Sequence, residues 1–162
     1  MAEIERKWVL EAPPDGLAER AHERVEQGYV ALDAAGAEVR VRRRGAKHTL
    51  TVKSAPGLVR VEEELPLSED QFASLWELTE GRRIVKTRHL VPLDDDLTAE
   101  VDVYEGALAG LVTAEVEFPS EEASAAFDPP AWLGREVTGD GRYANRALAV
   151  NGPVRSDAPG SR

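Results

Sequence analysis

Charged side chains alternate with other residues along most strand-like stretches of this chain, and that alternation constrains the fold more than any other feature. In the first stretch, residues 3–10, Glu3, Glu5 and Lys7 occupy every second position. Successive side chains of a β-strand point to opposite faces, so these three share one face. The same period of two recurs in seven further stretches: 26–32, 37–44, 48–54, 59–65, 83–91, 97–104 and 111–118.

Short connections such as DAAG at 33–36 favour antiparallel neighbours. The segment that begins PPDG predicts a helix ending near residue 24, and 67–81 predicts a second, with Ser68 and Gln71 as a capping box. SEEASAAF and RYANRALAV predict two shorter helices. Residues 1–150 are expected to form one domain, and the Pro- and Gly-rich residues 151–162 a disordered tail.

Composition narrows the class of protein. The 162 residues carry 30 acidic and 20 basic side chains, a formal net charge of −10, which argues against nucleic-acid binding. There is no cysteine, so disulfides and thiol nucleophiles are excluded. No apolar run is long enough to span a membrane and no signal-peptide pattern opens the chain, so we expect a cytoplasmic protein without membrane partners.

The charged strand faces hold both signs of charge and few Ser, Asn or Gln residues, unlike an ordinary wet sheet face. The cations are Lys7, Arg40, Arg42, Lys53, Arg60, Lys86 and Arg88. The anions are Glu3, Glu5, Glu62, Glu64, Glu100, Asp102, Glu115 and Glu117. A dry interior could not hold these ions, so a barrel with this face inward must admit water and a charged ligand.

The mixture of charges points to one ligand chemistry. Converging Arg and Lys side chains suit a chain of phosphates, because guanidinium groups contact phosphate oxygens in pairs. Carboxylates beside them would repel that ligand unless hard cations such as Mg²⁺ or Mn²⁺ intervene. The sequence therefore predicts metal-assisted chemistry on an oligophosphate.

Nine ordered segments resemble those of the CYTH group, the triphosphate tunnel metalloenzymes. They are EIERK, which has the form ExExK, followed by EQGYV, EVRVRRRG, LTVKS, RVEEELPL, KTRHLVP, AEVDVYEG, LVTAEVEF and WLGREVTGDGRYANRALA. The likeness covers about residues 3 to 150. It implies an α+β fold, an eight-stranded antiparallel barrel whose charged tunnel hydrolyses or cyclises triphosphate compounds with divalent metal, wrapped outside by amphipathic helices.

The resemblance also assigns roles to residues. Phosphate binding would fall to Lys7, Arg40, Arg42, Lys53, Lys86 and Arg88, with Arg60 as a further member. Two divalent ions, Mg²⁺ or Mn²⁺, would be held by Glu3, Glu5, Glu62 or Glu64, Glu115 and Glu117. Tyr29 is similar to the tyrosine that pairs with the motif lysine, Lys7, near the scissile bond, which makes these two the candidate catalytic residues.

Several assignments stay open at this point. Glu100 and Asp102 lie on the charged face, either as metal ligands or as salt-bridge partners of tunnel cations. Arg43 is expected on the outer face, Arg44 near a turn, and Glu63 on the outer face where similar proteins usually place an apolar residue. The three Trp residues are expected to be packing anchors.

We expect hydrolysis of inorganic triphosphate to diphosphate and phosphate. The alternatives are a class IV-type adenylyl cyclase, a thiamine triphosphatase, a non-catalytic polyphosphate- or nucleotide-binding module, and a scaffold whose tunnel is only a salt-bridge network. The low aromatic content, 6%, favours the inorganic substrate, because a base or thiazolium needs an apolar platform. The sequence leaves open the preferred metal and whether the chain is a monomer or a homodimer.

Overall fold

The protein is described from a computed structural model, which describes residues 3–155. The fold is α+β. The strands are β1 (Ile4–Val9), β2 (His22–Leu32), β3 (Glu38–Arg44), β4 (Lys47–Lys53), β5 (Glu62–Pro66), β6 (Arg83–Pro92), β7 (Thr98–Tyr104), β8 (Val112–Phe118) and β9 (Arg135–Glu136). The α-helices are α1 (Glu69–Trp76), α2 (Glu121–Ala126) and α3 (Asn145–Asn151). The 3₁₀ helices are η1 (Leu17–Glu19), η2 (Glu77–Thr79), η3 (Gly106–Leu108), η4 (Ala131–Leu133) and η5 (Gly141–Tyr143).

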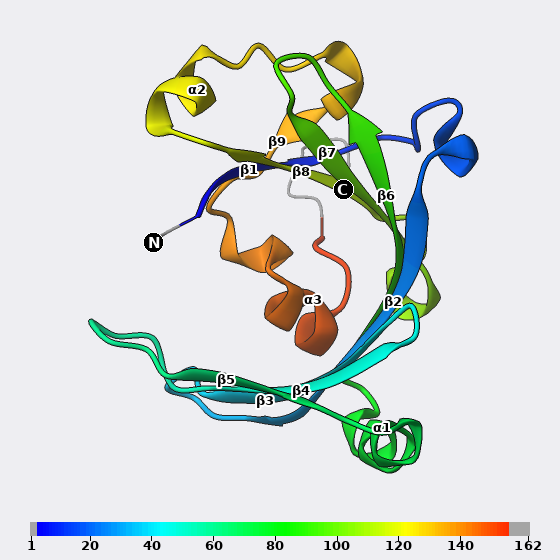
Figure 1. Cartoon of the computed structure of the whole chain (residues 1–162), viewed down its shortest axis with the longest axis vertical. Helices are drawn as coiled ribbons and strands as arrows, with labels where there is room; N and C mark the ends of the chain where they lie inside the picture. Colours follow the sequence, from blue (N-terminus) through cyan, green and yellow to red (C-terminus); the bar gives the residue numbers. More distant parts are fainter. Residues whose placement is uncertain (1–2, 156–162) are drawn as a thin grey trace. The chain divides into compact units, whose positions relative to one another are not determined.

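The strands form one sheet in the order β5-β4-β3-β2-β6-β7-β8-β1-β9 (Figure 1). All eight predicted strands are present, and their pairings with a defined register are antiparallel. The sheet has two edges, β5 and the two-residue β9, and the described residues do not close it into the eight-stranded barrel that the sequence predicted. The helices are few and short, so the predicted helical wrapping is sparse.

Two compact units divide the described residues. Unit 1 contains residues 3–25 and 85–140, and so carries β1, the start of β2, most of β6, and β7 to β9. Unit 2 contains residues 26–84 and 141–155, with the rest of β2, β3 to β5, α1 and α3. Each unit therefore has its own part of the sheet and its own polar face.

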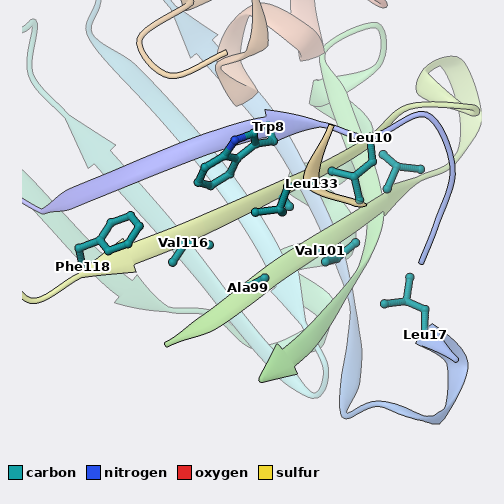
Figure 2. Packing of buried hydrophobic residues seen from close by; sticks show 10 residues of the cluster. Trp8, Leu10, Leu17, Ala99, Val101, Val116, Phe118 and Leu133 are labelled. Atoms are coloured by element: carbon teal, nitrogen blue, oxygen red, sulfur yellow. The ribbon is translucent and has the colours of Figure 1, made fainter. Parts of the chain in front are cut away.

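The core of unit 1 lies on one face of β1, β7 and β8. Its buried side chains are Trp8, Leu10, Leu17, Ala99, Val101, Val112, Ala114, Val116, Phe118 and Leu133. Figure 2 shows that side chains of β1, β7 and β8 gather on one side with Leu133 of η4. Trp8 and Trp132 contribute to this packing, as predicted for anchors. Since neighbouring strand positions face opposite ways, the charged residues of these strands are sent to the other face.

In unit 2, α1 packs against β3 and β4 (Figure 1). Its predicted capping box is confirmed: the Ser68 hydroxyl accepts from the backbone N–H of Gln71, and the Gln71 side chain accepts from the N–H of Ser68. Buried Phe72 stacks on Trp76 and also lies 4.9 Å beneath the guanidinium of Arg43. Arg43 is thereby confirmed on the outer face.

The predicted helix ending near residue 24 is wrong. Only the single 3₁₀ turn η1 forms there, preceded by Gly16 at φ 76° and followed by Arg20 in the extended region. β2 then begins at His22, and the N–H of Leu90 donates to the carbonyl of Ala21. Sheet pairing therefore overrides local helix propensity in this segment. In the described part of the chain, no helix is long and apolar enough to cross a membrane.

Candidate functional site

In unit 1, the polar face of β1 and β8 brings together carboxylates and one lysine. The antiparallel register pairs Glu5 with Glu117 and Lys7 with Glu115. The Lys7 Nζ atom lies 3.7 Å from an Oε atom of Glu115, and Glu5 can share a hydrogen bond with Glu115 when one of the two carboxyl groups is protonated. Four of the predicted site residues thus form one neighbourhood, as expected from the period of two.

Glu5 is the most perturbed acid of this group. As a residue it is exposed, but partial burial of its carboxyl group, the hydrogen bond with Glu115 and the charges of Glu115 and Glu3 raise its pKa to about 7. Lys7 opposes this shift without cancelling it. Negative charge therefore accumulates here beyond what the local lysine neutralises, and a cation at this place would relieve the repulsion.

A buried ion cluster on β6 and β7 contains Asp102. The carboxylate of Asp102 lies 2.8 Å from Lys86 Nζ and accepts two hydrogen bonds of 2.9 Å from Arg88. Lys86 and Asp102 are only 4% and 2% exposed, so water cannot replace these contacts. Asp102 is a salt-bridge partner of both predicted phosphate ligands, and Glu100 adds a longer contact of 3.5 Å to Arg88.

Burial and pairing act in opposite directions on this cluster. Burial lowers the pKa of Lys86, while the charge of Asp102 partly restores it. Burial alone would raise the pKa of Asp102, but the charges and hydrogen bonds of Lys86 and Arg88 hold it below its usual range. The pKa values of Lys86 and Asp102 therefore depend on one another.

Tyr104 completes this cluster, although no role was predicted for it from the sequence. It is paired with Lys86 across β6 and β7, and the Lys86 ammonium lies 5.5 Å from the centre of its ring. Its hydroxyl accepts a hydrogen bond of 3.4 Å from Thr113, and burial raises its pKa. The signal for it was its parity with Asp102 on β7.

In unit 2, β3 carries Arg40 and Arg42, and only one of their two Nε donors has a hydrogen-bond acceptor in the described residues. The Arg42 Nε donates to the side-chain oxygen of Gln27 at 2.8 Å. The Nη1 of Arg40 lies 3.9 Å from the buried Glu38, but its Nε is buried and has no hydrogen-bond partner among the described residues. A buried guanidinium nitrogen without an acceptor is costly, and a phosphate oxygen would satisfy it.

β4 and β5 place the remaining predicted ligands of unit 2 in pairs. Lys53 lies 3.6 Å from Glu62, its register partner, and the Thr51 hydroxyl lies 3.5 Å from Glu64. Glu62 and Glu64 are exposed, and the intervening Glu63 is paired with Val52 on the opposite face, as predicted. Both carboxylates can therefore be reached by a dissolved ion.

Arg60 differs from its prediction because β5 begins only at Glu62. The Arg60 Nε donates to the carbonyl of Ser54 at 2.8 Å, and its Nη2 lies 4.0 Å from Glu38. The exposed guanidinium thus connects the loop at Ser54 with Glu38, the first residue of β3. It is the weakest candidate among the predicted phosphate ligands.

Tyr29 is buried in unit 2, 1% exposed, and its hydroxyl accepts a hydrogen bond of 3.0 Å from the side chain of Gln27. Lys7, its predicted partner, belongs to unit 1. The pairing of Lys7 with Tyr29 therefore stays a prediction. Gln27 has the same parity as Tyr29 on β2, so its side chain shares that face, but no role was predicted for it.

The donor set fits hard divalent cations without a complete protein cage. Within residues 3–155, no group of three or more His, Cys, Asp or Glu side chains is arranged to hold a metal ion. Magnesium commonly takes only one or two carboxylates from a protein and completes its shell with waters and substrate phosphates. The neighbouring carboxyl groups of Glu5 and Glu115, with the raised pKa of Glu5, match that mode of binding.

The chain is similar to inorganic triphosphatases over nearly its full length. No family model matches the chain. An inorganic triphosphatase of Nitrosomonas europaea is 45% identical over 153 residues, which is 94% of this chain and all of that protein. One from Acetivibrio thermocellus is 39% identical over 92% of this chain and 94% of its own length. A crystal structure of an inorganic triphosphatase has a TM-score of 0.80 at 43% identity, covering 93% of this chain and 95% of that one.

Proposed function

Because the chain belongs to the CYTH family of triphosphate tunnel metalloenzymes, together with these inorganic triphosphatases, we propose that it hydrolyses inorganic triphosphate to diphosphate and phosphate. Identity over nearly the full length of two relatives with that name supports the activity. Among the features of the site, the buried Nε of Arg40, which has no acceptor in the described residues, gives the main support for phosphate binding. It is a donor within a cationic row and has no acceptor of its own in the described chain.

Phosphate-binding residues are proposed in each unit. Arg40 and Arg42 would hold phosphate oxygens in unit 2, with Lys53 and Arg60 beside them. In unit 1, Lys7, Lys86 and Arg88 supply the same chemistry. Phosphate binding by these cations is supported by their chemistry and by family membership. Water attacks the terminal phosphorus, the bridging P–O bond breaks, and diphosphate leaves with the bonding electron pair.

Two divalent ions, Mg²⁺ or Mn²⁺, are proposed as cofactors. Glu5 and Glu115 would hold one of them, with Glu3 just before β1 and Glu117 on β8 as further ligands. Glu62 or Glu64 of β5 would also bind metal. When bound, such ions neutralise phosphate oxygens and lower the pKa of a water. The residues themselves bind and orient: in unit 1, Lys7 would hold a phosphate oxygen beside Glu115.

The placement of aromatic residues supports a bare phosphate chain over a nucleotide or thiamine triphosphate. Trp8 is buried in the core of unit 1, and Trp76 stacks between Phe72 and the Arg83 guanidinium. On the polar faces, the ring of Tyr104 lies against Lys86. The large aromatics of the described chain are thus engaged in packing, leaving few to hold a base. A cytoplasmic setting and the choice between monomer and homodimer stay predictions.

The experiment is phosphate release from triphosphate and from ATP, each with Mg²⁺, with Mn²⁺ and without metal. We expect metal-dependent release from triphosphate that is lost in Glu5→Gln and kept in Glu11→Gln, an exposed residue outside the strands. Pyrophosphate and cyclic AMP from ATP, without release from triphosphate, would instead identify a cyclase. Binding of triphosphate without any turnover would identify a binding module.

Phosphate binding is tested on one strand of unit 2. Arg40→Lys removes the Nε donor and the fork of the guanidinium, so KM for triphosphate should rise roughly tenfold. Arg44→Lys, at the exposed end of the same strand, is the matched control. Equal KM values for the two variants would contradict the assignment of Arg40.

A further inference from the structure

Gln27 joins two of the predicted site residues through the two ends of one side-chain amide. It lies on β2 and is 1% exposed. Its Oε1 accepts from the Nε of Arg42 at 2.8 Å, and its Nε2 donates to the hydroxyl of Tyr29 at 3.0 Å. Both polar ends of the amide are therefore engaged by protein groups.

The chemistry of arginine fixes which way this amide points. A guanidinium can only donate hydrogen bonds, so the amide oxygen must face Arg42 and the NH₂ group must face Tyr29. The Tyr29 oxygen is then the acceptor of that bond, and its own hydrogen points elsewhere. Among residues 3–155, no acceptor for this hydrogen is found. A buried phenol is thus held with an unused donor.

The surroundings keep that phenol neutral and fixed in place. Burial, and next the charge of Glu38, raise the pKa of Tyr29, so the hydroxyl stays protonated near neutral pH. Arg40 and Arg42 act on it in the opposite direction, which places their charges close to the hydroxyl. The backbone of Tyr29 is held on both sides by Arg82, whose carbonyl accepts from the Tyr29 N–H at 3.0 Å and whose Nε donates to the Tyr29 carbonyl at 2.9 Å.

The strand that carries both side chains also has little freedom to shift. A Cβ atom at Gly28 would lie 2.5 Å from the hydroxyl oxygen of Thr79, so the opposite face of β2 is packed closely against η2. Gln27 and Tyr29 are thereby kept on the polar face, where the arginines of β3 lie. This fixed geometry is what a group acting on a reacting phosphate requires.

We propose that Gln27 is a positioning residue that makes Tyr29 a hydrogen-bond donor to a phosphate oxygen of the substrate. The same amide holds Arg42 beside that hydroxyl, so that a neutral donor and a cation are presented together. Tyr29 donates a hydrogen bond and neither gains nor loses its proton, and no bond to it forms or breaks. This inference rests on the proposed triphosphatase activity and assigns Tyr29 the role of donor instead of base.

The test exploits two substitutions that separate positioning from structure. In Gln27→Glu, the carboxylate still accepts from Arg42 but can only accept from Tyr29, so the phenol hydrogen turns away from the substrate. In Gln27→Met, both contacts are lost and the Arg42 Nε is left without its acceptor, but Tyr29 is not turned away. We expect kcat to fall roughly ten- to hundredfold in Gln27→Glu, as in Tyr29→Phe, and less in Gln27→Met.

A merely structural role predicts the reverse order, because Gln27→Glu keeps the Arg42 contact and Gln27→Met loses it. That order would overturn the proposal. The double variant with Tyr29→Phe should lose no more than Gln27→Glu alone, and multiplied losses would also overturn it. If Gln27→Glu does not fold, the double-mutant cycle is measured with Gln27→Met instead. In that background, Tyr29→Phe should lower kcat by a smaller factor than it does in the unmodified protein. Gln71→Glu adds the same charge within a surface capping box and is the control.

Failure of the proposed activity is recognised separately. The same variants are compared by calorimetric titration with inorganic triphosphate without added metal, which needs no turnover. If the unmodified protein releases no phosphate, the triphosphatase proposal fails. If Tyr29→Phe weakens triphosphate binding in the unmodified protein but not in Gln27→Glu, the positioning of Tyr29 is still supported. If Tyr29→Phe weakens binding in both, the proposal is overturned.

Discussion

Replacing Asp102 by Asn tests how far the buried ion cluster supports unit 1. Asp102 accepts from Lys86 at 2.8 Å and twice from Arg88 at 2.9 Å, and it is 2% exposed. Asn preserves the shape, but its NH₂ group must face one of two donors, and the negative charge is gone. Removing one partner of a buried ion pair typically costs about 3–5 kcal/mol, because the remaining charge stays buried without compensation. We expect a loss of that size in the free energy of unfolding.

The assay is urea unfolding near neutral pH, followed by circular dichroism. Asp128→Asn is the matched control, since Asp128 is exposed in the same unit and should change stability by less than about 0.5 kcal/mol. The pH dependence gives an independent check. Because the folded pKa of Asp102 is depressed, its stabilisation is present above the unfolded pKa and is lost as pH falls through the folded one. A loss below about 1 kcal/mol in Asp102→Asn would refute the cluster's role.

Three other perturbations have defined outcomes. Since the pKa of Glu5 is about 7 and metal ligands bind deprotonated, Mg²⁺ affinity measured by calorimetry should rise from about pH 6 to about pH 8, and Glu5→Gln should flatten that rise. Gly28→Ala should lower the free energy of unfolding by about 1–3 kcal/mol, and Thr79→Ala should recover part of it, both measured in urea. The pKa of Glu136 is lowered to about 2 by hydrogen bonds from Arg6 and Thr138, so its stabilising contribution should persist above about pH 4.5 and be lost toward pH 2, as followed by NMR titration of its carboxyl group.

The positions of the strands and their faces could be predicted because they depend on local alternation. Lys7 and Glu115 meet as register partners, and Lys53 meets Glu62, because a period of two fixes which side chains share a face once the strands pair. The capping box of α1 is equally local, and Ser68 and Gln71 behave as their spacing requires. Closure of the sheet depends on long-range geometry that no such pattern encodes.

The errors arise where local signals compete with pairing. The helix ending near residue 24 was favoured by its residue types, but β2 extends back to His22 because that segment can pair with β6. Arg60 was placed on a strand by parity, yet its guanidinium is used by the Ser54 carbonyl in the connecting loop. Gln27 was not singled out from the sequence, because its bridging role depends on how Arg42 approaches it from β3, and spacing within β2 does not reveal that.

The cations of the polar faces differ in how much of their charge is already compensated, and this decides what a substrate gains from each. Arg88 already has a bidentate carboxylate, so a phosphate must compete with Asp102 for its donors. Arg40 has one distant carboxylate contact of 3.9 Å and a buried Nε without an acceptor. Affinity for an anion should therefore depend more on Arg40, whereas Arg88 and Lys86 with Asp102 fix the shape of the face that receives it. A charged row on a strand can thus contain both binding groups and the groups that keep the sheet in register, and only their partners distinguish them.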